Sequence, residues 1–436
     1  MSKYSTYKDS GIEWIGEIPE HWDRTKMKYG VNQISERDTP LREDIKISPE
    51  NVESNTGVCL NLYSDYDGDG MKFTKGDILF NKLRLYLKKI LFTEYDGYSL
   101  GEMIVLRTKE NLNNKYFYYL IFNQGLIDLL DSQSTGIKMP RVSPETIINS
   151  NIPIPSTNEQ QQIVAFLDYK TEKIDNLIGH KEKKIELLKE KRTALINHVV
   201  TKGLNPDVEL KDSGIEWIGE IPIHYQMISI KFLVTTPVTD GPHETPVFVD
   251  EGIPFLSVNG VVGNKINFNK VRGYISEELH IEYSKKCKPQ RDDVLLVKSG
   301  STTGKSTIVE TDLDFNIWSP LCIIRSNPNK IIPRFTFQTF QSRYFRVLIE
   351  DNWSYGTQPN IGMNVIENLS IVVPPISEQQ QIVDYLDKQT KEIDDLIQLE
   401  QQKIELLKEY RQSLISEVVT GKVRVCEKDK SGNLGS

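Results

Sequence analysis

The sequence predicts an α+β fold in which two α/β domains are separated by two long antiparallel coiled-coil helices and related by an internal pseudo-two-fold repeat. The first observation is a duplicated segment, because KDSGIEWIGEIP stands at Lys8–Pro19 and again, unchanged, at Lys211–Pro222. The second is a longer duplication, in which Glu159–Thr201 aligns without gaps to Glu378–Thr420 with 26 identities in 43 positions. Two copies of one plan account for both repeats.

Length and composition describe a globular protein. The chain has 436 residues, which predicts about three domains or two domains with connecting elements, and 38% of its residues are hydrophobic. The sequence has no apolar run of the ~18 residues that a membrane span needs, and its start lacks the apolar stretch of a secretory signal. Its four cysteines lie far apart, without zinc-site or disulfide spacing. We therefore expect a cytoplasmic protein without a membrane partner.

The repeats divide the chain into successive segments. We expect the repeated N-terminal segment at 1–22, the first α/β domain at 23–155, the first conserved helix at 156–203, a linker with the second repeated segment at 204–222, the second α/β domain at 223–375, the second conserved helix at 376–421 and a polar tail at 422–436. Within the α/β domains, apolar runs predict strands at Asp77–Phe80, Met103–Leu106, Val294–Val297 and Leu321–Ile324. Helical stretches are expected near Tyr116–Leu130 and Phe335–Ile349. The tail from Glu427 to Ser436 is expected to be disordered.

The long duplicated segments carry a coiled-coil pattern. Asn158 and Ser377 are the expected N-caps, with Gln161 and Gln380 three residues later as capping-box partners. Apolar residues then recur at heptad spacing over about five heptads. The expected helix core is Leu167, Ile174, Ile178, Ile185, Leu188, Leu195 and Val199 in the first copy and Leu386, Ile393, Ile397, Ile404, Leu407, Leu414 and Val418 in the second.

Such a stripe needs a partner surface. Either each helix packs on its own α/β domain, or the two helices pair with each other, which we favour. An intramolecular antiparallel pair would place the two domains at opposite ends. Lys181 and Glu400 occupy equivalent stripe positions with opposite charges, which favours this pairing over like-with-like dimers.

No motif specifies a catalyst, a metal site or a cofactor. Gly300–Ser306 (GSTTGKS) imitates a phosphate loop, but it has three residues between its glycines where a Walker A motif has four. It is therefore interpreted as a hydroxyl-rich loop that contacts a DNA phosphate or base edge, with a plain turn or a nucleotide site as alternatives. Asp65–Gly70 imitates a calcium loop, yet position 12 of that loop is Gly76 instead of glutamate. An acidic turn is the better interpretation.

The distribution of charge points to DNA although the net charge is −8. Lys72–Lys89 contains six basic residues and one acid, and Lys285–Lys305 contains six basic residues and two acids. A charge run is usually a solvated face, but two runs at matching places in a duplicated chain fit two half-sites on one duplex. The candidate DNA-binding residues are Lys72, Lys75, Lys82, Arg84, Lys88, Lys138 and Arg141 in the first domain and Lys298, Thr302, Thr303, Lys305, Gln358 and Asn360 in the second.

These features together resemble the specificity (S) subunits of type I restriction–modification systems. The resemblance is carried by the duplicated DSGIEWIGEIP, by the P-x-x-x-E-Q-Q-x-I-V entry to each long helix at Pro155–Val164 and Pro374–Val383, and by Gly76–Leu79 (GDIL). The second domain departs from GDIL with Asp292-Asp-Val-Leu295. The resemblance covers essentially the whole chain.

The resemblance implies a non-catalytic subunit of a methyltransferase and endonuclease complex. Each α/β domain would be a target recognition domain that reads one half of a bipartite double-stranded DNA site, and the helices would be the spacer. Two modification (M) subunits, which use S-adenosylmethionine, and restriction (R) subunits, which translocate DNA with ATP, would bind to it. A P-loop-like nucleotide hydrolase and a coiled-coil scaffold without DNA binding are the alternatives. Trp14 and Trp217, in the repeated segments, are expected to be packing anchors more often than partner contacts.

Overall fold

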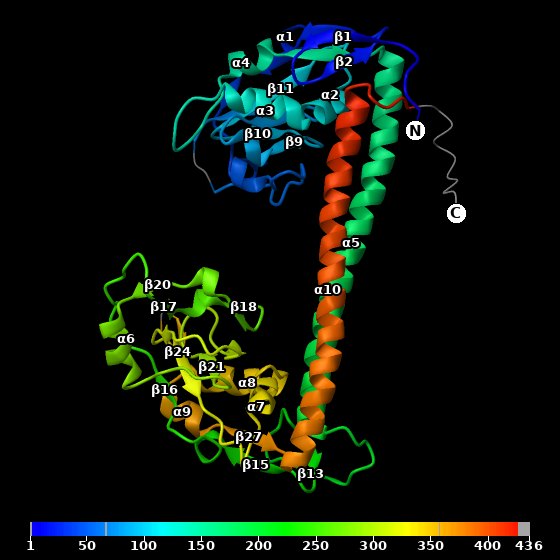
Figure 1. The fold of residues 1–436 in the computed structure, drawn as a ribbon. Helices are drawn as coiled ribbons and strands as arrows, with labels where there is room; N and C mark the ends of the chain where they lie inside the picture. The colour runs from blue at the N-terminus through cyan, green and yellow to red at the C-terminus, as the bar shows by residue number, and fades with distance from the viewer. Residues whose placement is uncertain (1, 66–67, 357, 426–436) are drawn as a thin grey trace. The chain divides into compact units, whose positions relative to one another are not determined.

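The computed structural model describes residues 2–65, 68–356 and 358–425, and the chain forms two compact units. Unit 1 combines residues 1–182 with 402–436, and unit 2 is the continuous stretch 183–401. The long helices α5 (Thr157–Lys202) and α10 (Ile376–Val419) each contribute one half to each unit (Figure 1). These helices and the mixed α/β domains confirm the predicted fold class. The expected disordered tail from Glu427, and residues 66 and 67 of the expected acidic turn, lie outside the described residues.

A four-stranded antiparallel sheet is central to unit 1. Its order is β4 (Val31–Ile34), β11 (Met103–Thr108), β8 (Ile78–Asn81), β9 (Ile90–Phe92). Ile78 and Phe80 belong to a core shared with the helices, whereas Leu79 belongs to a second core against the neighbouring sheet. Because both faces of the sheet are buried at its centre, β8 and β11 begin with continuous apolar runs.

Unit 2 repeats this sheet. Its order is β16 (Thr239–Asp240), β24 (Leu321–Ile324), β21 (Val294–Val297), β22 (Ser306–Ile308). Val294 and Leu296 lie in the core with the helices, and Leu295 and Val297 lie in the other core. The four apolar runs that predicted strands are therefore the central strands of the two sheets.

Smaller sheets and helices complete each unit. In unit 1 these are β5 (Arg37–Asp38), β7 (Gly70–Phe73), β10 (Gly97–Ser99) and β6 (Lys46–Ile47) in one sheet, the pairs β1 (Tyr7–Ile12) with β2 (Gly16–Pro19) and β3 (Asp23–Lys26) with β12 (Asn151–Ile154), and the helices α1 (Met27–Gly30), α2 (Asn114–Ile121), α3 (Gln124–Ser132) and α4 (Pro144–Asn149). In unit 2 they are β20 (Gly273–Ile275), β17 (Ile253–Leu256) and β23 (Asn316–Ile317) in one sheet, the pairs β13 (Leu210–Asp212) with β14 (Glu220–Pro222), β15 (Gln226–Ser229) with β27 (Ser370–Val373), β18 (Val261–Val262) with β19 (Lys265–Ile266) and β25 (Ser354–Tyr355) with β26 (Pro359–Asn360), and the helices α6 (Glu277–Ser284), α7 (Pro333–Phe340), α8 (Arg343–Asn352) and α9 (Met363–Asn368).

Each helical stretch expected from the sequence is two short helices. The break in unit 1 comes at Asn123, whose side chain accepts a hydrogen bond from the Gly125 backbone N–H and so caps α3. Ser342 caps α8 in unit 2 by accepting from the Phe345 N–H. An N-cap residue takes an extended conformation, so the chain cannot continue as one helix through either position.

The long helices run antiparallel within each unit. In unit 1, Leu167 and Ile174 share a core with Leu414 and Val418, and the Arg411 Nε lies 2.9 Å from the Asp175 Oδ1. The structure buries Leu167, Ile174, Ile404, Leu414 and Val418 and half-buries Ile178 and Leu407. The apolar stripes of both helices therefore meet in this unit.

Unit 2 repeats the same helix contacts. Val199 shares a core with Leu386, and Arg192 Nε lies 2.9 Å from Asp394 Oδ1, at the repeat equivalents of Arg411 and Asp175. Glu400 is 3% exposed and its carboxylate is 3.0 Å from the Lys184 Nζ. The structure buries Ile185, Val199, Leu386 and Ile393 and half-buries Leu188, Leu195 and Ile397.

The helix starts differ from the sequence prediction. α5 begins at Thr157, so Asn158 lies inside the helix, and Ser156 acts as the cap by accepting from the Glu159 N–H at 3.3 Å. α10 begins at Ile376, which places Ser377 inside it as well. The predicted N-caps were therefore wrong.

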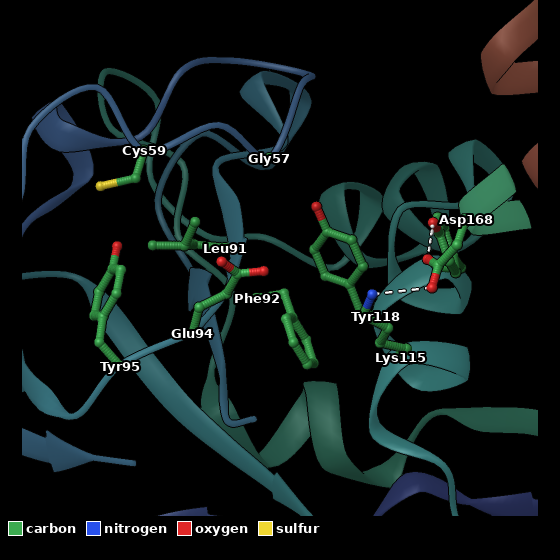
Figure 2. A pocket seen from close by; sticks show the side chains of 10 residues that line it. Gly57, Cys59, Leu91, Phe92, Glu94, Tyr95, Lys115, Tyr118 and Asp168 are labelled. Carbon is green, nitrogen blue, oxygen red and sulfur yellow. Dashed lines mark hydrogen bonds and ion pairs between the residues drawn. The ribbon is translucent and has the colours of Figure 1, made fainter. Parts of the chain in front are cut away.

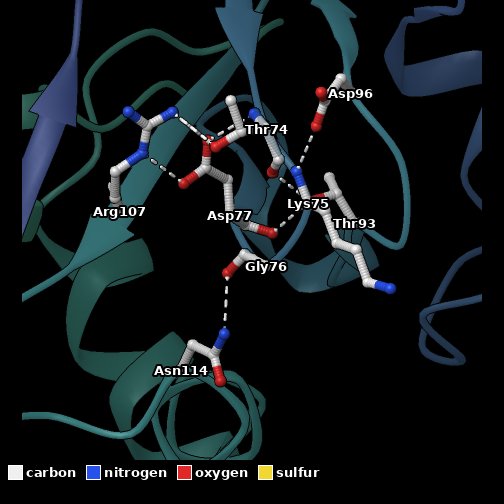
Figure 3. Close-up of polar contacts among 8 residues, drawn as sticks. All are labelled: Thr74, Lys75, Gly76, Asp77, Thr93, Asp96, Arg107 and Asn114. Atoms are coloured by element: carbon white, nitrogen blue, oxygen red, sulfur yellow. Dashed lines mark hydrogen bonds and ion pairs between the residues drawn. The ribbon is translucent and has the colours of Figure 1, made fainter.

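One turn explains why the second domain departs from the GDIL motif. Gly76 has φ +92° and its repeat equivalent, Asp292, has φ +72°, so both copies keep a left-handed residue at this place. The next residue is the buried Asp77, which accepts from the Thr74 N–H and from Arg107 (Figure 3). Asp293 makes the same contacts in unit 2 with the Gln290 N–H and with Arg325. The two motifs are therefore structurally equivalent.

None of the helices in the described part of the chain combines the length and the apolar composition that crossing a membrane requires.

Candidate nucleic-acid interface

A short hairpin joins the end of β8 in unit 1. Thr135 and Arg141 exchange two backbone hydrogen bonds of 2.9 Å, and we call residues 135–141 hairpin 1. The Arg84 N–H donates to the Pro140 carbonyl at 2.9 Å, and the Val142 N–H donates to the Lys82 carbonyl at 3.0 Å. The structure therefore brings together four predicted residues, Lys82, Arg84, Lys138 and Arg141, although two segments far apart in the sequence supply them.

Unit 2 builds the same arrangement. Ser354 pairs with Asn360, and we call residues 354–360 hairpin 2. The Gly300 N–H donates to the Pro359 carbonyl at 3.0 Å, and the Ile361 N–H donates to the Lys298 carbonyl at 2.9 Å. These bonds match those of unit 1 one for one. They bring together the predicted residues Lys298, Thr302, Thr303, Lys305, Gln358 and Asn360.

An acidic residue holds the basic side chains of the first surface. The Lys82 Nζ is 3.4 Å from the Glu102 Oε2, and Arg141 pairs with the other oxygen of the same carboxylate. Glu102 is 27% exposed, so all three groups reach water. A phosphate can therefore reach both cations from solvent.

In unit 2 a fully buried carboxylate holds the basic side chains of the second surface. Asp240 is 0% exposed, and its oxygens lie 2.7 Å from the Lys286 Nζ, 3.1 Å from the Lys298 Nζ and 3.2 Å from the His243 Nε2. Burial alone would raise the pKa of Asp240, but the bonds from Lys286 and Lys298 outweigh it and hold the pKa below its ordinary value. The Lys298 side chain is itself only 11% exposed. Lys298 therefore stabilises the fold through its ion pair with Asp240 and is also a candidate DNA contact.

Three predicted residues are not part of the first surface. Lys75 precedes β8 and Lys82 follows it, so they stand at opposite ends of a strand about 13 Å long. Lys72 lies in β7, where it is 3.4 Å from both Glu36 and Asp38. Lys88 is 3% exposed and donates to the Phe122 carbonyl at 3.4 Å; burial lowers the pKa of its ammonium group. Because Lys88 lies in the interior, we remove it from the interface.

The basic runs are less positive in space than in sequence. In the second run, Lys288 pairs with Asp314 at 2.7 Å and Arg291 pairs with Asp312 at 2.6 Å, in addition to the two lysines on Asp240. Lys305, by contrast, is exposed. Acids from other parts of the fold therefore neutralise most of that run, which a count along the sequence could not reveal.

The nucleotide-hydrolase alternative is not supported. Gly300–Lys305 connects the antiparallel strands β21 and β22, whereas a phosphate loop opens into a helix whose N-terminal N–H groups bind the phosphate. The Thr303 hydroxyl is occupied, since it donates to the Gly300 carbonyl at 2.8 Å. Within residues 2–65, 68–356 and 358–425 the structure has no group of three or more metal-ligating His, Cys, Asp or Glu side chains.

A cavity of about 310 Å³ lies between α2 and the 57–59 loop in unit 1 (Figure 2). The polar side chains that line it contact one another. The Lys115 Nζ is 2.9 Å from the Asp168 Oδ2, and the Tyr119 hydroxyl donates to the other oxygen of that carboxylate at 2.7 Å. Arg334 and Gln338 bind Asp387 in the same way in unit 2. These contacts dock α2 on α5 and α7 on α10, so we assign them to the fold.

The E-Q-Q entry to each long helix also fixes a domain. Gln160 is 1% exposed; its oxygen accepts from the Asn113 N–H at 2.7 Å and its nitrogen donates to the Pro155 carbonyl at 3.0 Å. Gln379 is 0% exposed and makes the equivalent bonds with the Ile332 N–H and the Pro374 carbonyl. The motif therefore joins each helix to the domain that precedes it.

The family model described as "Type I restriction modification DNA specificity domain" matches residues 33–187 and 248–409, which is most of the chain. The chain belongs to this family. As a type I restriction–modification specificity subunit it has two recognition domains, and the two hairpin surfaces lie one in each.

Curated relatives of this chain are specificity subunits of the same kind of system. The chain is 26% identical over 431 residues to the type I restriction enzyme MjaVIII specificity subunit of Methanocaldococcus jannaschii, covering 94% of both chains. It is 22% identical over 285 residues to the EcoBI specificity subunit of Escherichia coli, covering 63% of this chain and 58% of that one. Its fold matches, with a TM-score of 0.70 and 16% identity, a chain in a solved structure on complex assembly and conformational transition of the type I R-M system, covering 93% of this chain and 99% of that one.

The sequence did not reveal every residue of the specificity subunit's two surfaces. Glu102, Asp240 and His243 were missed because they come from segments outside the basic runs. The tryptophans of the repeated segments also differ: Trp14 packs partly buried on the core of unit 1, while Trp217 is 45% exposed. Identical sequences therefore have different surroundings in the two units.

Proposed function

We propose that this specificity subunit reads a bipartite DNA site, with one half-site at each hairpin surface. The observation that carries the proposal is the equivalence of the two surfaces. Each unit ties a hairpin to the end of its central strand by the same pair of backbone hydrogen bonds, and each surface presents exposed side chains that suit phosphates or base edges. Arg84, Lys138 and Arg141 are exposed in unit 1, and Lys305, Gln358 and Asn360 are exposed in unit 2.

The proposal includes a division of labour. This chain recognises the DNA sequence. Modification subunits methylate the DNA, and restriction subunits translocate and cleave it. The absence of a methyltransferase motif in the sequence and the strand that follows the Gly300 loop both support a non-catalytic role. Purified chain incubated with DNA and labelled S-adenosylmethionine should transfer no methyl group until a modification subunit is added. Transfer by the chain alone would contradict this role.

The two-reader model is tested by exposed substitutions in each unit. Arg84→Ala with Lys138→Ala should change recognition of one half-site, and Lys305→Ala with Gln358→Ala should change recognition of the other. Each lost base contact should cost about 1–3 kcal/mol, whereas each lost phosphate contact should weaken binding uniformly and reduce the salt dependence. The measurement is methylation-site sequencing of cells that express each variant with its partner subunits.

Matched controls keep this test specific. Lys75→Ala changes a lysine at the opposite end of β8 and should leave both half-sites unchanged. Lys298 is avoided because its removal would leave Asp240 with one lysine fewer. If either double variant altered both half-sites equally, the two-reader model would be wrong.

A further inference from the structure

Hairpin 1 carries two apolar side chains at its tip. Ile137 is 103% exposed and Met139 is 58% exposed, with the exposed Lys138 between them. Among the residues that the structure describes, none covers the Ile137 side chain. An exposed side chain of this kind contributes no burial to folding, so its chemistry is available to a partner.

The base of hairpin 1 is held firmly. The Thr135–Arg141 backbone pair closes it, and the Arg84–Pro140 bond fixes it to the loop after β8. Arg141 stands at its foot, paired with Glu102. The hairpin therefore presents an apolar tip, and hydrogen bonds fix its foot beside cationic side chains. This combination suits contact with the edge of a nucleobase that lies between two phosphate backbones.

Hairpin 2 has the same backbone bonds, but polar or small residues stand at the two positions equivalent to Ile137 and Met139. Gly356 takes the place of Ile137, and Gln358 takes the place of Met139. A Cβ added at Gly356 would meet open space, so glycine is not required there by crowding. The apolar tip is therefore a property of the first recognition domain, and the scaffold that both hairpins share does not demand it.

We propose that Ile137 and Met139 read a thymine methyl group in the major groove of the first half-site. Thymine presents its C5-methyl group there, where apolar side chains contact it, and the groove admits a two-stranded ribbon. The inference rests on the proposed function and deepens it by naming one specificity element. Lys138 and Arg141 would contact the backbone beside the methyl group, which orients the tip.

The test removes one methyl group at a time. Duplexes carry deoxyuridine in place of each thymidine of the first half-site in turn, and binding is measured with the chain assembled with its modification subunits. At one thymidine the replacement should weaken binding about fourfold, the factor expected for one buried methyl-sized group. A variant with Ile137→Gly and Met139→Gln, which copies the tip of hairpin 2, should bind the thymidine and deoxyuridine duplexes equally well.

A matched control comes from the second recognition domain. Leu313 is 51% exposed, and Leu313→Ala should leave the deoxyuridine effect intact. The inference is overturned if no deoxyuridine matters, if the first half-site has no thymine, or if the effect is the same in the tip variant. It is also overturned if the tip variant fails to assemble without DNA, because the tip would then contact a subunit. Failure of the unmodified complex to bind any specific DNA would instead contradict the proposed function.

Discussion

The two recognition domains have equivalent backbone arrangements, but different acidic residues pair with their basic side chains. In the first, a partly exposed carboxylate, Glu102, pairs with Lys82 and Arg141. In the second, a fully buried carboxylate, Asp240, pairs with Lys286, Lys298 and His243. The backbone bonds between hairpin and strand are the same in both. The scaffold of this specificity subunit is thus constant, while the electrostatics of each surface belong to the individual domain.

The largest expected difference follows from removing these acids. Asp240→Ala leaves the nearly buried Lys298 ammonium without its carboxylate, and removing one partner of a buried pair costs about 3–5 kcal/mol of unfolding free energy. Glu102→Ala should cost under about 1 kcal/mol because its partners reach water. Denaturant unfolding of both variants measures the difference. Asp312→Ala, which removes the exposed partner of Arg291, is the control and should change little. Equal costs at Glu102 and Asp240 would refute the contrast.

The next effect should be equal in the two domains. Gln160→Leu and Gln379→Leu each leave a buried N–H and a buried carbonyl without a partner, which costs about 1–3 kcal/mol. The same loss is expected in both units because the hydrogen bonds correspond. Denaturant unfolding is compared with Gln161→Leu and Gln380→Leu, whose side chains are exposed. A large cost in one unit only would show that the repeat is less symmetric than its bonds suggest.

A smaller effect should differ in size between the two domains. Gly76→Asp places a side chain on a left-handed residue, and its Cβ would lie 2.8 Å from the Asn114 Nδ2, so stability should fall by about 1–2 kcal/mol. Asp292→Gly relieves the same conformation in unit 2, so stability should change by less than about 1 kcal/mol, because added freedom of the unfolded chain offsets the relief. Thermal unfolding measures both. A fully stable Gly76→Asp variant would contradict the expected strain and crowding at Gly76.

The smallest effect appears only in acid. The pKa of Asp240 is lower in the folded protein than in the unfolded chain, so its ionised carboxylate stabilises the fold at neutral pH. That contribution is fully present above the ordinary aspartate value of about 4 and is lost as the pH falls through the lower, folded value. As the pH falls below about 4, the unfolding free energy should therefore decrease less steeply in Asp240→Asn than in the unmodified protein. Identical pH profiles would show that Asp240 carries no such linkage.

Much of the fold could be predicted because its signals are local. Heptad spacing identified both long helices, and continuous apolar runs such as Val294–Val297 identified strands that are buried on both faces. These features depend on residues that are neighbours in the chain.

The candidate interface was harder to predict because its features come from distant segments. Lys88 belongs to a basic run, yet the fold buries it against the Phe122 carbonyl. Asp240 comes from a strand that precedes the second basic run by many residues, so charge counting along that run missed it. Ile137 is apolar inside a Gly- and Pro-containing turn, a signal that the sequence did offer but that a search for basic residues passed over.

The composition of unit 1 from both ends of the chain has a consequence for its synthesis. Unit 2 is continuous, so all of it has been synthesised before the ribosome adds residue 402. In unit 1, Leu167 and Ile174 are synthesised long before Leu414 and Val418, with which they share a core. The interval is roughly 10 to 50 seconds at a synthesis rate of roughly 5–20 residues per second. During that time the apolar stripe of the first recognition domain stays uncovered, whereas unit 2 is complete once residue 401 has been added. A chain that terminates at residue 401 would therefore retain all of unit 2 but lack the helix half that covers the stripe in unit 1.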